Sequence, residues 1–249
     1  MKKVFAVIAL ILTVPAFAQS ADLEGRTLTV GSDTTYPPFE TVDQEGNVVG
    51  FDVDVVNAIC ERVNCVAEFR TTAWDGIFPA LAGGEFDMVA SGVSITAERD
   101  QIVDFTDPYL AVTEAIAVRV EDEALTLEDF TEGDLVLGAQ TGTTNAVTAE
   151  SLVGRERLRL YDNFNTAVQA LLSGDVNGVE IDGTSAAAFV EQYAGELTVS
   201  IDDVESGTEL GFVVQEGDAL VDALNAGLAE IKADGTLEAL AEKWLAVQP

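Results

Sequence analysis

The chain has 249 residues, 48% of them apolar, which is enough for one large domain or two small lobes with a sizeable core. Its 12 Lys and Arg against 44 Asp and Glu give a formal net charge of −32, so we expect a solvated acidic surface and exclude the polyanions nucleic acid and anionic lipid as partners. The sequence contains no His, which excludes Ser-His-Asp triads, Cys-His dyads and His-bound metals, and we expect neither a metal nor a cofactor.

The first residues have the pattern of an export signal. Lys2 and Lys3 precede an apolar stretch at 4–14, whose 11 residues are too few to span a bilayer. A small-x-small cleavage pattern follows at 16–18. We therefore predict a signal peptide over residues 1–18, and a mature soluble protein that starts at Gln19 and resides in the periplasm.

The first half of the chain alternates between strand and helix patterns. Apolar and β-branched runs predict strands, apolar residues at helical spacing predict helices, and Gly83-Gly84 ends the second helix. The predicted elements are a strand at 27–31, a helix at 52–63, a strand at 66–69, a short helix at 74–81 and a strand at 86–90. This alternation favours βαβ units with a mostly parallel sheet.

The pattern then restarts without a Pro/Gly/Ser-rich linker. Strands are predicted at 115–118, 135–139, 158–160, 178–181, 197–201 and 210–214, with helices from Asn145, at 166–172 and at 185–193. Two closing helices have apolar stripes that begin at Leu220 and Leu237, with a break at Asp234-Gly235. Two α/β blocks without a linker indicate two lobes, and the cleft between them is a natural ligand site.

Cys60 and Cys65 are the two cysteines of the chain. In an exported protein they are expected to form one disulfide. The alternative is a pair of buried thiols at a helix end. Because the loop between them is short, we expect a modest entropic contribution to stability.

Several motifs, in this order and spacing, carry a family resemblance. They are 33–39 (DTTYPPF), 50–54 (GFDVD), 73–76 (AWDG), 91–99 (SGVSITAER), 104–109 (DFTDPY), 142–144 (GTT) and 234–236 (DGT). With them the mature chain resembles, over nearly its whole length, the bacterial family 3 of extracellular solute-binding proteins, which serve polar amino-acid ABC transporters. Lysine/arginine/ornithine-binding proteins are similar members.

The resemblance implies an α/β type II periplasmic-binding-protein fold, in which two lobes joined by a two-strand hinge close on the ligand. Lobe 1 is expected at 19–112 and 208–249, and lobe 2 at 113–207. The implied function is capture of a polar L-amino acid, with a basic one favoured, and its delivery to a membrane-embedded ABC permease. Relatives act as monomers, so a monomer is expected, and no catalysis is expected.

Arg99 is the candidate partner of the ligand α-carboxylate. A guanidinium can hold a carboxylate through two parallel hydrogen bonds, although a surface Arg that answers Glu98 or Asp100 is the alternative. The resemblance assigns Arg99 the ligand role. It also implies that Thr143 and Thr144 contact the carboxylate from the second lobe. They lie at a turn before a helix, where free backbone amides can bind an anion; a hydroxyl that simply caps the helix is the alternative.

The α-ammonium and the side chain of the ligand need other partners. The resemblance places Asp182 at the ammonium, helped by Ser94 and by the backbone near Ser91 and Gly92; capping of the next helix is the alternative role for Asp182. Tyr36 and Trp74 match the aromatic walls of the family. Asp33 matches the acidic side-chain contact of the basic-amino-acid binders, and Gln140 stands where those relatives carry an apolar residue.

Two other classes of function stay open. Exported cyclohexadienyl dehydratases resemble this family and need a carboxylic acid three residues after the position of Asp182. Here that position holds Ser185, which cannot protonate a leaving group in this way; Glu180 is the nearby carboxyl, and its facing is undetermined. A sensory module of this fold would act as a receptor for a separate partner.

Overall fold

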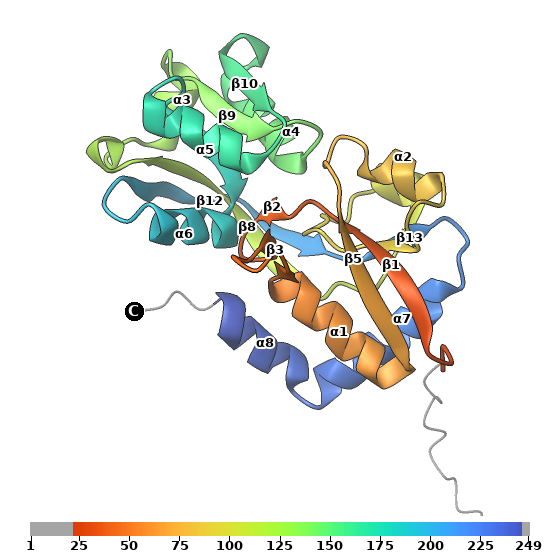
Figure 1. Cartoon of the computed structure of the whole chain (residues 1–249). Coiled ribbons are helices and arrows are strands. Elements are labelled where there is room, and N and C mark those ends of the chain that lie inside the picture. Colours follow the sequence, from red (N-terminus) through yellow and green to blue (C-terminus); the bar gives the residue numbers. More distant parts are fainter. Residues whose placement is uncertain (1–21, 246–249) are drawn as a thin grey trace, which may run out of the picture.

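The computed structural model describes residues 22–245, and the predicted signal peptide lies outside them. One five-stranded sheet has the order β5-β1-β6-β13-β7, with α1, α2, α7 and α8 around it (Figure 1). Its strands are β5 (Cys65–Thr71), β1 (Arg26–Ser32), β6 (Met88–Val89), β13 (Val213–Gln215) and β7 (Val103–Phe105). Its helices are α1 (Phe51–Val63), α2 (Ile77–Ala82), α7 (Leu220–Ala233) and α8 (Thr236–Leu245).

The second sheet has the order β10-β9-β11-β8-β12 and is surrounded by α3 to α6 (Figure 1). Its strands are β10 (Leu158–Tyr161), β9 (Leu137–Gln140), β11 (Gly178–Asp182), β8 (Leu110–Arg119) and β12 (Leu197–Leu210). Its helices are α3 (Leu127–Glu132), α4 (Thr144–Val153), α5 (Phe164–Ser173) and α6 (Gly183–Gln192). A small sheet contains β2 (Thr35–Tyr36), β3 (Glu40–Val42) and β4 (Val48–Val49), and the short 3-10 helices are η1 (Arg99–Gln101), η2 (Val120–Asp122) and η3 (Arg155–Arg157).

Two long strands connect the sheets. β8 and β12 pair antiparallel from Leu110↔Leu210 to Arg119↔Leu197, with register shifts in between. Both strands belong to the second sheet, and at Leu210 the pair reaches Ser94, which follows β6 of the first sheet and forms a bridge with it. A pair of strands with such irregular register is a natural place for bending. The division of the chain into lobes at residues 112 and 207 stays a prediction.

α1 shows why these sequences form these elements. Its apolar positions at helical spacing are buried, with Val55, Ile59 and Val63 fully covered. Asp52 lies in its first turn, where a carboxylate interacts favourably with the helix dipole. Asn64 ends the helix in the left-handed conformation at φ 55°.

Several predicted elements differ from the observed ones. The sheets are mixed rather than mostly parallel, because β13 runs antiparallel to β6 and β7, and β8 runs antiparallel to β11 and β12. The strand predicted at 197–201 continues to Leu210, because pairing with β8 overrides its acidic sequence. The strand predicted at 210–214 is interrupted at Gly211 and Phe212, and the short helix begins at Ile77 rather than at Trp74. β7, α3 and the small sheet were not predicted.

The predicted disulfide is confirmed between Cys60 and Cys65, which are five positions apart. It joins the end of α1 to the start of β5. Because the closed loop is so short, replacing both cysteines with alanine is expected to lower the free energy of unfolding by only about 2 kcal/mol. Amino-acid affinity should not change, because Cys65 starts β5, whereas residues of the candidate site follow the carboxyl ends of the parallel strands, at the opposite edge of the sheet. Urea unfolding and calorimetric titration of the double variant check both expectations, and a large loss of affinity would contradict the second.

Gly50 occupies a position that only glycine fits. Its φ is 150°, and a Cβ there would lie 2.1 Å from the carbonyl oxygen of Phe39. Gly50→Ala is therefore expected to lower the free energy of unfolding by about 3 kcal/mol or more. Gly46 is the matched control: its φ of 90° is also positive, but a Cβ there has open space, so Gly46→Ala should cost about 1–2 kcal/mol. Equal losses in thermal unfolding would show that the contact with Phe39 is unimportant.

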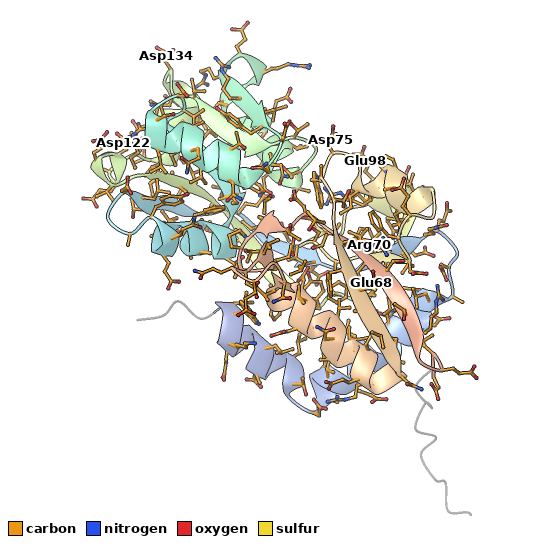
Figure 2. All side chains as sticks on the ribbon, in the orientation of Figure 1. Glu68, Arg70, Asp75, Glu98, Asp122 and Asp134 are labelled. Carbon is orange, nitrogen blue, oxygen red and sulfur yellow. A yellow bond between two sulfur atoms is a disulfide. The ribbon has the colours of Figure 1, made fainter. Side chains whose placement is uncertain are left out.

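The acidic residues are distributed over both sheets. Figure 2 labels Asp122 and Asp134 on the part built around the second sheet and Glu68 on β5 of the first. Among residues 22–245, no helix has the length and apolar character needed to cross a membrane.

Candidate ligand-binding site

A cavity lies between the two sheets. All eleven ligand-binding residues predicted from the sequence line it, and two further residues, Asn145 and Phe164, complete the lining. The predicted residues are Asp33, Tyr36, Trp74, Ser91, Gly92, Ser94, Arg99, Gln140, Thr143, Thr144 and Asp182. The structure thus brings them together, while their contact with a ligand stays a prediction.

The Arg99 guanidinium is held in the cavity without a carboxylate partner. Its Nη1 donates to the carbonyl oxygen of Ser94 at 2.9 Å, and its Nη2 donates to that of Gly142 at 3.4 Å. The guanidinium carbon lies 5.3 Å above the Trp74 ring and 5.4 Å above the Phe78 ring. Within residues 22–245, no carboxylate is close enough to Arg99 for an ion pair.

This environment makes Arg99 a suitable anion partner. Burial lowers the pKa of Arg99 to about 10, and the charges of Asp182 and Glu98 oppose that shift. The group therefore stays charged at neutral pH while it is partly removed from water. A partly desolvated cation without a counter-charge binds an incoming carboxylate more strongly than a surface Arg does.

The start of α4 supplies further donors. The Thr143 hydroxyl donates to the carbonyl oxygen of Gln140 at 2.7 Å and accepts from the Ala146 amide at 3.1 Å, so it acts as the helix cap. The Thr144 hydroxyl lies 3.2 Å from that of Ser94. Since the first amides of a helix lack partners within it, this turn can bind an anion in addition to being capped.

Asp182 is the buried acid of the cavity. One carboxylate oxygen accepts from the Tyr36 hydroxyl at 2.6 Å, and the other accepts from the side-chain amide nitrogen of Asn145 at 3.0 Å. Its side chain does not cap α6, so the capping alternative is wrong. Burial raises the pKa of Asp182 to about 6, and the hydrogen bonds from Tyr36 and Asn145 oppose the rise. A carboxylate in this setting gains most from a cation that enters with it.

Aromatic rings form the apolar part of the wall. Tyr36 stacks on Phe39 with ring centroids 5.3 Å apart, and on Phe164 from the start of α5 at 5.2 Å. Trp74 contacts Phe78 edge-on. These surfaces can pack against the aliphatic part of a ligand side chain.

A buried hydrogen-bond network supports the floor of the cavity. The Ser91 hydroxyl donates to Glu40 at 2.7 Å, and the Gly92 amide donates to Asp52 at 2.9 Å. Tyr109 donates to the other oxygen of Asp52 at 2.7 Å. Burial raises the pKa of Asp52 to about 7 and that of Glu40 well above its usual range. The signature acid Asp52 therefore positions the floor rather than lining it.

Sequence reasoning missed Asn145 and Phe164. Asn145 follows the predicted Thr144 directly, and its 4% exposure marks it as a buried polar group that needs a partner. Phe164 begins α5, one residue after the Asn163 cap, and nothing in the local sequence separates it from an ordinary core residue.

The groups around the cavity match the chemistry of an α-amino acid. A guanidinium and helix amides can hold a carboxylate, a buried carboxylate can hold an ammonium, and a second acid, Asp33, is left for a polar side chain. Glu180 and Ser185 are fully buried, and neither lines the cavity. The two positions relevant to acid catalysis therefore lie outside it.

Two α/β lobes that enclose such a cavity and are joined by two strands define the type II periplasmic-binding-protein fold. Residues 28–247 match the bacterial extracellular solute-binding proteins, family 3, and the chain belongs to that family. An Escherichia coli (strain K12) protein named ABC transporter arginine-binding protein 1 is 32% identical, with 98% of this chain and 99% of the relative covered.

Solved structures agree with this assignment. An ancestral arginine-binding protein bound to arginine is 35% identical, with a TM-score of 0.83 over 90% of this chain and 100% of that one. An ancestral amino-acid-binding protein described as a precursor of cyclohexadienyl dehydratase is 35% identical, with a TM-score of 0.79 over 88% of this chain and 95% of that one.

Proposed function

We propose that this protein is the periplasmic substrate-binding protein of an ABC importer, that it captures a polar L-amino acid and that it delivers the amino acid to a membrane permease. The observation that carries the proposal is that one cavity holds both the Arg99 guanidinium, which has no carboxylate partner among residues 22–245, and the buried Asp182 carboxylate. The printed names of the relatives, which describe arginine binding and ABC transport, support the same ligand class.

A basic amino acid is the favoured ligand. The two acidic side chains of the cavity lining, Asp33 and Asp182, outnumber its single cation, Arg99, so a ligand with a second positive charge complements the site. Arg99 and the α4 amides bind the α-carboxylate, Asp182 and Ser94 bind the α-ammonium, and Asp33 receives the side chain. Lobe 1 (19–112 and 208–249) closes on lobe 2 (113–207) and removes these groups from water. The protein acts as a monomer and catalyses no reaction.

A thermal-shift screen tests the function. The mature protein is refolded to remove copurified ligand and is then heated with each of the amino acids. A ligand at about 100 times its dissociation constant adds about 2.7 kcal/mol to stability, which raises the melting temperature measurably. Stabilisation by arginine, lysine or ornithine supports a basic ligand. Stabilisation by glutamine or glutamate alone keeps the receptor and rejects the basic preference.

A dehydratase is the second candidate, favoured by its precursor among the similar structures. The lining argues against it, because Ser185 holds the position that needs an acid and Glu180 does not reach the cavity. Incubation with prephenate and detection of phenylpyruvate decides between the two. Product formation, with no stabilisation by any amino acid, would reject the receptor.

A further inference from the structure

Phe78 contacts the Arg99 guanidinium from outside the cavity lining. It is the second residue of α2, and its ring centroid lies 5.4 Å from the guanidinium carbon. The Trp74 centroid lies 5.3 Å from the same carbon, and the Trp74 and Phe78 rings meet edge-on at 80°, with their centroids 5.6 Å apart. Trp74 lines the cavity and Phe78 does not, so Arg99 is held between a ring of the wall and a ring outside it.

The two rings hold the cation without neutralising it. An aromatic ring attracts a guanidinium through the negative charge of its face and brings no counter-ion. An acidic partner would also hold Arg99, but the carboxylate of the ligand would then have to displace that partner. A guanidinium has five N–H donors, and the bonds to the carbonyl oxygens of Ser94 and Gly142 use two of them. The charge and the remaining donors therefore stay available to a ligand carboxylate.

These contacts differ in what happens to them when the lobes separate. Gly142 follows β9 of the second sheet, so its bond to Arg99 is lost on opening. Phe78 lies on α2, which belongs to the part built around the first sheet, as Trp74 and Ser94 do (Figure 1). In the open protein the two rings and the Ser94 carbonyl oxygen thus restrain the side chain. Ordering a long side chain only when the ligand arrives would weaken affinity about twofold to tenfold.

We propose that Phe78 is a positioning residue for Arg99, and that its ring holds the guanidinium ready for the ligand carboxylate while the lobes are open; this inference rests on the proposed function. Because Phe78 does not line the cavity, its contribution to affinity passes through Arg99. The contribution depends on the charge of the ring face. A merely structural role, in which Phe78 packs against Trp74, would depend on the size and apolar character of the ring instead.

Calorimetric titration with arginine of proteins that carry mono-, di- or trifluorinated phenylalanine at position 78 tests the proposal. Fluorine withdraws charge from the face of the ring, while it changes the ring size little and makes the ring more apolar. Arginine affinity should therefore fall in steps, to about threefold below that of the wild type for the trifluorinated ring, as for the loss of one cation–π contact. An affinity that stays constant or rises along the series overturns the proposal.

The matched control is the same fluorinated series at Phe86. Phe86 belongs to the same apolar cluster as Trp74, and within residues 22–245 no cation lies over its ring. Arginine affinity should not change there, and equal losses at both positions overturn the proposal. Two ordinary variants give a second test: Phe78→Tyr keeps the ring face and should keep the affinity, whereas Phe78→Leu should lose about threefold. Equal affinities of these two variants overturn the proposal, and the fluorinated series decides alone if Phe78→Leu fails to fold.

A failure of the proposed function gives a different result. If the wild-type protein binds no amino acid, the receptor assignment falls, while the contact between Phe78 and Arg99 can still be measured by thermal unfolding without ligand. The trifluorinated ring at position 78 should then lower the melting temperature of the wild type and not that of Arg99→Ala, because two groups in contact have non-additive effects. Equal shifts in the two backgrounds overturn the positioning role of Phe78.

Discussion

Replacing Arg99 with alanine is expected to weaken amino-acid binding by about 100-fold or more, equivalent to about 2.7 kcal/mol. The guanidinium is the cation of the cavity lining, and its loss leaves the α-carboxylate of the ligand desolvated against the Asp33 and Asp182 carboxylates. Arg99→Lys keeps the charge but cannot form two parallel hydrogen bonds, so it should recover only part of the affinity. Isothermal titration calorimetry measures both variants.

The matched control for this experiment is Arg70→Ala. Arg70 lies on β5 and pairs with Glu68 at 2.9 Å; both side chains are 55% exposed, and Figure 2 labels both. The control removes the same charge from the protein, so it tests whether net charge alone affects affinity. Equal affinity of Arg99→Ala and the wild type would show that this mode of ligand binding is wrong.

Local sequence pattern predicts the elements in which the buried positions coincide with the apolar residues. The apolar residues of β1, Leu28 and Val30, are buried within its sheet, and α7 begins at Leu220, where its apolar stripe begins. In such elements the hydrophobic period and the tertiary burial agree, so propensity and packing indicate the same structure.

β12 is the counterexample, because its second half reads DDVESGTE between residues 202 and 209. Acidic residues and glycine are unfavourable in strands, and no alternation of apolar and polar side chains is visible. The strand forms there because its backbone pairs with β8, whose sequence lies about ninety positions earlier in the chain. Such pairing is a tertiary property that a local window cannot detect.

In the candidate site, too, the sequence predicts some features and tertiary structure decides others. The family resemblance predicts eleven lining residues, of which nine lie in the motifs that carry it, while Gln140 and Asp182 are placed by the resemblance alone. The contacts between those residues could not be predicted. Gln140 and Asp33 are 107 positions apart, and their hydrogen bond depends on how the two connecting strands set one sheet against the other. The same holds for Phe164, which stacks on Tyr36 only once the lobes are brought together.

Amino-acid affinity is expected to fall by about 100-fold between pH 7 and pH 4, through the titration of Asp182. Burial raises the pKa of this carboxyl to about 6 in the ligand-free protein. A bound ammonium stabilises the ionised form and lowers the pKa, so below pH 6 a proton must leave Asp182 when the ligand enters. Each pH unit below 6 then costs up to about tenfold in affinity.

The stability of the ligand-free protein should change in the opposite direction. Since the pKa of Asp182 is higher in the folded protein than its usual value of 3.8, the folded state binds more protons between about pH 4 and pH 6. The contribution of Asp182 to the free energy of unfolding therefore decreases as the pH rises through this window. Ligand binding strengthens over the same range, so stability and affinity should respond to pH with opposite signs.

The variant Asp182→Asn separates the pH dependence caused by Asp182 from that caused by the other buried acids. Glu40 and Asp52 also have raised pKa values, and Glu114 and Glu180 lie near Asp182, so the wild-type profile alone contains several titrations. The variant retains the shape of the side chain but not its charge. Its affinity should be at least tenfold weaker at pH 7 and nearly constant from pH 7 to pH 4. If calorimetric titration instead gave parallel profiles for variant and wild type, Asp182 would not be the group that binds the ammonium, and the pH dependence would belong to the acids beneath the cavity floor.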